Sequence, residues 1–194
     1  LTHDGEGMFD KDYDTSLLST YDLTFNASGK LNIQSLAVDA LTLDTKLSEL
    51  SGIVTTNTLR VDHKVLNTTG LTVQNVIGTG SLYNQGVLKL NGTADHFATL
   101  GIHELINEKN ELSGIDPQIE SAYLHITSSN QGLMNGEDAY FCVTETLRVD
   151  SLERGQFLNN GQIKIRRGEI NRYFVNSFHG DLIILDQLAI ACSL

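Results

Sequence analysis

The sequence predicts an all-β fold, a right-handed parallel β-helix (solenoid) with coils of about 16–18 residues. Three observations predict it: a recurring turn phrase, apolar triplets that recur about every six residues, and rows of similar length. The turn phrase occurs as NASGKLNI (26–33), NTTGLTV (67–73), NQGVLKL (84–90) and NNGQIKI (159–165). A single coil of such a repeat cannot bury its apolar face alone, so the coils are expected to stack.

The rows are 35–51, 52–69 and 70–85, with 17, 18 and 16 residues, and a fourth begins at 86. Each apolar–any–apolar triplet has the period of a short strand that shows one face to a core. The Asn, Asp, Ser, Thr and Gly between the triplets predict turns. Three columns are expected to stack: Leu36, Ile53, Leu71 and Val87; Leu41, Leu59 and Val76; and Leu47, Val65 and Leu82.

Other β architectures fit this pattern less well. Sandwiches and hairpin barrels usually have longer strands with turns every 8–12 residues. A left-handed hexapeptide helix requires a stricter period of six, so the variation between 16 and 18 residues favours the right-handed coil. Pro117 is the only proline, as expected where backbone amides pair on both sides of a strand.

The rhythm is interrupted between 93 and 145. Residues 93–114 have a weak helical pattern, which predicts a short helix or an inserted hairpin. The phrase TLRVD, present at 58–62, returns at 146–150. We therefore expect one β-helix segment over 1–194, with an acidic leading segment at 1–22 and irregular coils or an insertion at 93–145. The absence of a starting Met and the abrupt end suggest a fragment of a larger protein.

Charge and composition argue against several classes. The net charge of −11 argues against a nucleic-acid partner, because the one dense basic spot is Lys164, Arg166 and Arg167. No apolar run approaches the ~20 residues that a membrane-spanning helix needs. Cys142 and Cys192 lie among apolar neighbours, which predicts buried free thiols.

The candidate chemical sites are weak. Asp10, Asp12 and Asp14 resemble the start of a calcium loop, with Asp4 and Glu6 nearby, but the Gly and Glu that complete such a loop are missing. The six histidines show no metal-ligand spacing and are expected at turns or in solvent: His3, His63, His96, His103, His125 and His179. No nucleophile elbow or phosphate-binding loop occurs. We therefore predict no enzyme, no cofactor, and no catalytic, cofactor-binding or metal-binding residue.

The phrases VLNTTGLTV, SLYNQGVLKL and FLNNGQIKI resemble the shaft repeats of filamentous haemagglutinin-like exoproteins. This two-partner-secretion group includes adhesins and contact-dependent inhibition toxins. The resemblance covers 29–92 and 146–190, and the Asn-Pro-Asn motifs of the family's secretion domain are absent. It implies a secreted rod at a bacterial cell surface that serves in adhesion, toxin delivery and virulence.

The same resemblance implies the partners. These are a receptor or glycan on a host or target cell and the rest of the protein's own long chain, with neither nucleic acid nor membrane insertion by this segment. Loops that leave a regular scaffold often carry binding, so 93–145 is the expected recognition region. Its candidate contacts, for which core packing is an equal explanation, are Tyr83, Tyr123, Tyr140 and Phe141.

Two alternatives stay open. One is a carbohydrate-binding or carbohydrate-cleaving β-helix of the phage-tailspike or pectin-lyase type, and the other is an intracellular scaffold. Hydrolases of that fold carry paired aspartates and a Gly-His-Gly stretch, whereas this chain has FHG at 178–180 and no Asp-Asp pair. A groove lined by clustered carboxylates on one outer face would favour the carbohydrate-active reading over the rod.

Overall fold

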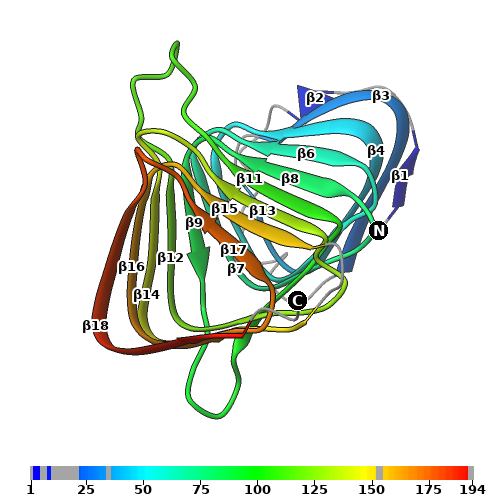
Figure 1. Ribbon diagram of the computed structural model, residues 1–194. Coiled ribbons are helices and arrows are strands. Elements are labelled where there is room, and N and C mark those ends of the chain that lie inside the picture. The colour runs from blue at the N-terminus through cyan, green and yellow to red at the C-terminus, as the bar shows by residue number, and fades with distance from the viewer. Residues whose placement is uncertain (1, 5–7, 10–21, 34–35, 152–154, 192–194) are drawn as a thin grey trace.

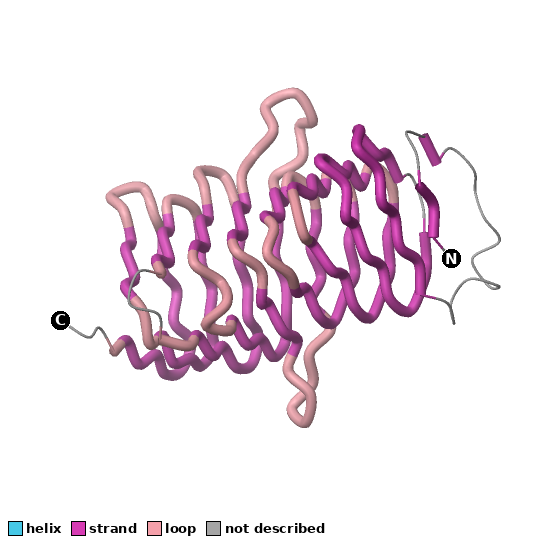
Figure 2. Tube along the Cα trace, turned by 90° about the vertical axis from the view of Figure 1, so that its right-hand side faces the viewer, coloured by secondary structure: helices cyan, strands magenta, loops and turns pink. Residues whose placement is uncertain are grey.

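A computed structural model describes residues 2–4, 8–9, 22–33, 36–151 and 155–191. In this part of the chain, parallel strands stack into a β-solenoid of about 8 turns, and no helix occurs. Figures 1 and 2 show the coils following one another along a single axis, with the first and last coils at opposite ends. The prediction of an all-β parallel solenoid is therefore confirmed. The described residues contain no helix that could cross a membrane.

Two kinds of strand build the coils. Eight longer strands bend across two faces of the solenoid: β3 (Asp22–Ile33), β4 (Leu36–Leu50), β5 (Ile53–Val61), β7 (Gly70–Ile77), β12 (Gln118–Ile126), β14 (Tyr140–Val149), β16 (Gln162–Ile170) and β18 (Asp181–Ile190). Eight others have four residues each: β6 (Lys64–Asn67), β8 (Ser81–Asn84), β9 (Val87–Leu90), β10 (Ala98–Gly101), β11 (Glu104–Asn107), β13 (Gly132–Asn135), β15 (Gln156–Asn159) and β17 (Tyr173–Asn176). Two short strands, β1 (Thr2–Asp4) and β2 (Met8–Phe9), pair with β3.

Each coil contributes to three faces, which we number in chain order. Face 1 holds β9 and the first parts of the longer strands, such as 162–165 of β16. Face 2 holds β10 and the second parts, such as 167–170. Face 3 holds β6, β8, β11, β13, β15 and β17, which pair in parallel one coil after another.

Alternating side chains along these strands build the core. The predicted column of Leu41, Leu59 and Val76 is confirmed, and it continues to Leu100 and Ile126. All five side chains are fully buried. The two copies of TLRVD occupy equivalent places on face 2, because 58–61 of β5 and 146–149 of β14 are both second parts of longer strands.

The other two predicted columns are wrong by one residue at some positions. Leu36 pairs with Val54, and Leu71 pairs with Leu88, so Ile53 and Val87 face outward. Ile53 is 70% exposed while Val54 is fully buried, since neighbours in a strand point to opposite faces.

Leu47 is the third misplaced position. It pairs with Lys64 on the outside, while Ser48 takes the core position beside Val65. The hydroxyls of Ser48 and Thr45 bond to each other, and this bond allows two polar side chains to be buried where a leucine was expected.

A ladder of asparagines runs along one inner corner of the solenoid. Each side-chain amide nitrogen donates to the next amide oxygen, over 2.7, 2.7, 2.8, 2.8 and 2.6 Å. The amide nitrogens also donate to backbone carbonyls one coil on, as Asn135 Nδ2 does to Gln162 O at 3.1 Å. The ladder therefore holds successive corners together and explains the recurring Asn of the turn phrase. Its members are Asn67, Asn84, Asn107, Asn135, Asn159 and Asn176.

In NNGQIKI, the two asparagines have different places. Asn159 ends β15 and is fully buried in the ladder, while Asn160 and Gly161 form the bend. Ile163 and Ile165 enter the core, as the repeat predicts. The first asparagine is therefore a core residue and not only a turn residue.

The coils lengthen in the middle of the chain. Successive ladder asparagines are 17, 23, 28, 24 and 17 residues apart, so the predicted 16–18 holds toward both ends. Much of the extra length lies in loops 91–97 and 108–117, which project from the stack in Figure 2. The region 93–145 otherwise continues the coils as β10 to β14. The helix expected within 93–114 is wrong, because Leu100 and Leu105 are buried from separate strands and Leu112 is 96% exposed in a loop.

Candidate functional site

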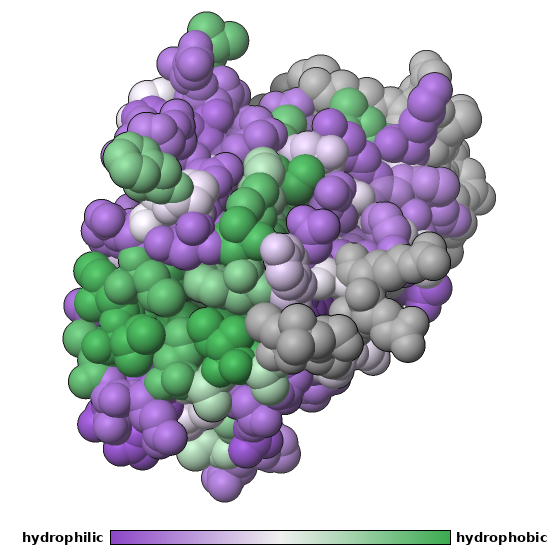
Figure 3. Space-filling model, viewed as in Figure 1, coloured by the Kyte–Doolittle hydropathy of each residue, from purple (hydrophilic) through white to green (hydrophobic). Residues whose placement is uncertain are grey.

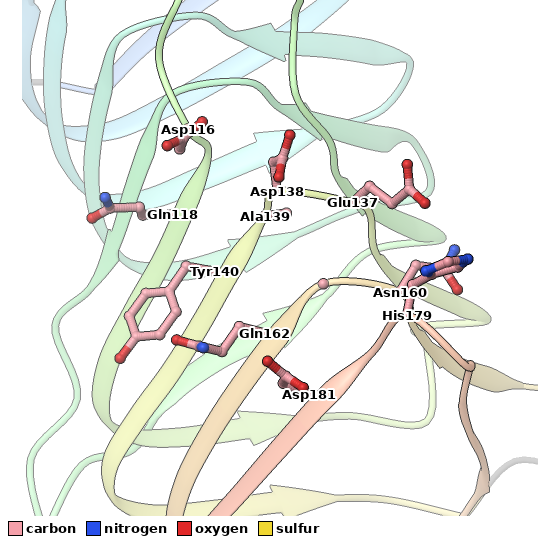
Figure 4. A pocket seen from close by; sticks show the side chains of 11 residues that line it. Asp116, Gln118, Glu137, Asp138, Ala139, Tyr140, Asn160, Gln162, His179 and Asp181 are labelled. Atoms are coloured by element: carbon pink, nitrogen blue, oxygen red, sulfur yellow. The ribbon is translucent and has the colours of Figure 1, made fainter.

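The outer side of face 1 carries a column of polar side chains. Gln118, Tyr140, Gln162 and Asp181 are register partners on β12, β14, β16 and β18. Parallel neighbours lie ~4.8 Å apart, so these side chains form a ladder with one rung per coil. Figure 4 shows them on adjacent strands, beside acidic residues that come from the preceding turns.

These residues line a groove, which we call the face 1 groove. Its volume is about 500 Å³. The loop before β12 and the turns before β14, β16 and β18 supply one wall, and the polar column supplies the floor. The lining residues are Asp116, Gln118, Glu137, Asp138, Ala139, Tyr140, Asn160, Gly161, Gln162, His179 and Asp181.

One lysine neutralises part of the groove's negative charge. Lys109 Nζ lies 2.8 Å from Asp116 Oδ1 and 3.3 Å from Asp138 Oδ2. Hydrogen bonds with these two carboxylates raise the pKa of Lys109. This ion-paired cluster ties the 108–117 loop to the turn before β14, and among the lining residues Glu137 and Asp181 have no ion-pair partner within the described part of the chain.

Tyr140 lies at the centre of the surface. A hydrogen bond with Cys142, then desolvation, then the negative charges of Cys142 and Glu120 raise the pKa of Tyr140 to about 12. Its hydroxyl therefore stays protonated at neutral pH and can donate a hydrogen bond, while its ring offers an apolar surface.

A second hollow of about 400 Å³ shares Tyr140 with the groove. It lies toward the other edge of face 1 and includes Lys89, Glu120 and Cys142, which are register partners on β9, β12 and β14. The two hollows together form one polar surface that crosses several coils.

The chemistry of this surface suits a ligand rich in hydroxyl groups. Carboxylates accept hydrogen bonds, the amides of Gln118, Gln162 and Asn160 both donate and accept, and Tyr140 adds a ring against which an apolar sugar face can pack. Within the described ranges, no group of three or more His, Cys, Asp or Glu residues could hold a metal ion.

The predicted histidines fall in different surroundings. His179 lines the face 1 groove, His63 lies 3.2 Å from Asp44, and His125 lies 2.9 Å from Asp150. His96 and His103 are exposed, as predicted for histidines in solvent or at turns.

The predicted acidic and basic sites give no further site. Asp10, Asp12, Asp14 and Glu6 lie outside the described residues, as does Cys192. Cys142 is a buried free thiol, as predicted. Of the basic spot, Arg166 pairs with Glu145 at 2.9 Å and Arg167 pairs with Asp186, so two of its three charges are balanced.

The aromatic candidates separate into core and surface. Phe141 is fully buried and packs edge-to-face on Phe157. Tyr83 lies under Lys64 on face 3, and Tyr123 packs against Phe97 with ring centroids 5.4 Å apart. Of these candidates, Tyr140 is the one that lines the face 1 groove.

The residues of the groove were missed as a group because they are far apart in the sequence. Asp116, Glu137, His179 and Asp181 come from successive coils of unequal length, and the register of those coils brings them together. A signal was nevertheless present, since a residue with a polar group begins each of four face 1 strands.

Comparison with known proteins adds no relative. No family model, no curated protein and no solved structure matches the chain. The arrangement of residues on face 1 is therefore what indicates the function.

Proposed function

We propose that this chain is a structural and adhesive rod segment of a large secreted bacterial surface protein, and that its face 1 groove binds a glycan on another cell. The observation that carries the proposal is the groove itself, a polar surface about 500 Å³ in volume on the flank of a regular stack of coils. The repeats, which resemble filamentous haemagglutinin-type shafts, place the rod in an adhesin or a toxin-delivery filament.

Stiffness supports the role as a rod. The coils share one core and one buried asparagine ladder, so bending the stack would break contacts in several columns together. Edge-to-face packing of Phe141, Phe157 and Phe174, with centroids 5.6 and 5.2 Å apart, adds a further column.

The spacing of the groove supports a glycan as the ligand. Polar side chains repeat once per coil along the column, about 4.8 Å apart, and a linear oligosaccharide offers hydroxyl groups at a comparable repeat. Free Glu137 and Asp181 and neutral Tyr140 can each bond a sugar hydroxyl without a metal ion.

A cell-binding experiment tests this proposal. Beads coated with the chain should adhere to a cell type that carries the ligand, and enzymatic removal of surface glycans should abolish adhesion, whereas protease treatment that leaves glycolipids should not. A glycan array then identifies the class. Adhesion that survives removal of all glycans, or an array without a hit, would contradict a glycan ligand.

A carbohydrate-cleaving enzyme is the second candidate, because unpaired Glu137 and Asp181 line one groove. Hydrolysis of a glycoside normally needs two carboxylates that flank the bond. Release of new reducing ends from a bound glycan, lost in Glu137→Gln and in Asp181→Asn, would favour the enzyme. Binding without release would favour the adhesive rod.

A further inference from the structure

The last coil exposes side chains that every earlier coil buries. Ile165 and Ile170 of β16 are fully buried, whereas their register partners Ile184 and Ile190 of β18 are 44% and 43% exposed. Phe174, Leu182 and Leu188 are also only partly buried. Figure 3, which looks onto this end, shows apolar residues gathered in the area that β17 and β18 enclose. We call this surface the C-terminal end face.

The backbone of the same coil is open. Asp181 N donates to Gly161 O at 2.8 Å and Ala191 N donates to Ile170 O at 2.9 Å, so those amides point back toward the preceding coil. Backbone groups alternate along a strand, which directs the amides of Leu182, Ile184, Leu188 and Ile190 to the free side. In the described part of the chain, β18 pairs with β16 alone and β17 with β15 alone.

This edge also lacks the features that normally prevent strand pairing. Exposed edges are usually protected by lysine, proline or a covering segment. The sequence of β18, DLIILDQLAI, contains no lysine, arginine or proline, and Asp186 is ion-paired with Arg167. Exposed apolar surface and free backbone groups therefore coincide.

The two ends of the solenoid differ, and the difference indicates the occupant. At the first coil, β1 and β2 already pair with β3 at 24–26 and 32–33, so a copy stacked head-to-tail would have to displace them. A second copy turned end-for-end meets no such obstacle. Its coil winds in the opposite sense, so facing strands are antiparallel, and antiparallel strands form good hydrogen-bond ladders.

We propose that the C-terminal end face is a self-association surface, on which a second copy of this chain docks tail-to-tail about a two-fold axis. The same patch serves both copies, so the contact is closed and gives a dimer and not a filament. The dimer covers Ile184 and Ile190 and pairs the free amides of β18 in both chains. Two rods joined in this way would point their first coils in opposite directions.

Sedimentation velocity of the 194-residue chain tests the proposal. The expected species has twice the 21.3 kDa of a single chain and dissociates on dilution. The double variant Ile184→Lys/Ile190→Lys should sediment as a monomer with an unchanged far-UV spectrum. The control Leu112→Lys makes the same chemical change at an apolar residue, 96% exposed, on the 108–117 loop, and should remain a dimer.

Hydrogen exchange gives a second readout on the unmodified chain, independent of whether the double variant folds. The amides of Leu182, Ile184, Leu188 and Ile190 should become more protected as concentration rises, while those of the 108–117 loop should not. A monomer at all concentrations would overturn the proposal. So would an open series of larger oligomers, a dimer that persists in the double variant, or protection at β18 that is independent of concentration.

Discussion

The side-chain amide nitrogen of Asn84 lies 2.7 Å from the amide oxygen of Asn107, one coil further along the solenoid. Both residues are fully buried. The ladder to which they belong begins at Asn67, whose Oδ1 is buried without a hydrogen-bond partner in the described part of the chain. The cause is the preceding coil, which places Leu50 at the same corner.

Replacing an interior member of the ladder should cost more than replacing its first member. Asn107→Leu removes the bond from Asn84 and the bonds to Asn135 Oδ1 and Tyr140 O, and leaves the Asn135 oxygen unsatisfied. Asn67→Leu removes two donated bonds but also removes an oxygen that is already unsatisfied. We expect Asn107→Leu to lower the free energy of unfolding by ~3 kcal/mol and Asn67→Leu by ~1 kcal/mol, measured by urea denaturation. Equal losses would show that the ladder does not carry this energy.

A charge in the core column should unfold the coils around it. Leu59→Asp places a carboxylate without a partner at a fully buried position, which costs several kcal/mol. Far-UV circular dichroism and thermal melting should show loss or loosening of the fold. Asp62→Asn is the matched control, because Asn can still accept the bond from Arg60 Nε, and its melting temperature should be close to that of the parent. An unchanged melting curve for Leu59→Asp would refute the column assignment.

Two glycines in equivalent turn phrases should respond differently to alanine. A Cβ at Gly161 would lie 2.2 Å from Gly136 O and 2.4 Å from Ala139 O, so the backbone must move. At Gly70 the nearest atom would be Ile53 Cγ1 at 3.9 Å, an ordinary contact. We expect Gly161→Ala to destabilise by ~1–3 kcal/mol, and Gly70→Ala to be neutral or to stabilise by ~0.5 kcal/mol. Comparison of their denaturation midpoints checks this, and the reverse order would count against the described turns.

The raised pKa of Tyr140 predicts a loss of stability in alkaline solution. Its folded pKa of about 12 lies above the ~10 of an unfolded tyrosine, so its contribution is complete below pH ~10 and is lost as the pH rises toward 12. Ultraviolet titration should lose one late-ionising phenol in Tyr140→Phe. In Cys142→Ala, loss of the hydrogen bond to Cys142 should bring the pKa of Tyr140 back toward its usual value. A titration identical in the parent and in Cys142→Ala would contradict this cause.

The sequence predicted the architecture because the solenoid is written locally. Period-2 triplets and turn residues place Leu59, Val76 and Ile163 in the core without any knowledge of distant contacts. The register was harder to predict, since Ile53 and Val54 are both apolar and only their hydrogen-bonded partners in neighbouring coils decide which one faces inward.

The groove was beyond prediction for a related reason. Its position depends on how many residues each coil uses, and the coils vary between 17 and 28 residues along the ladder. A loop of unequal length shifts Asp116 and Asp138 toward Lys109 without leaving a local sequence signal. The buried role of Asn159 was hidden similarly, because a turn asparagine and a ladder asparagine look alike in the sequence.

Calorimetric titration of the array-selected glycan into three forms of the chain tests the central claim most directly. Tyr140→Ala should weaken binding at least tenfold, equivalent to ~1.4 kcal/mol, because Tyr140 is common to both hollows of face 1. Tyr83→Ala, which removes a tyrosine from face 3, should bind like the parent. Equal affinity in all three forms, or a loss confined to Tyr83→Ala, would contradict a glycan site in the face 1 groove.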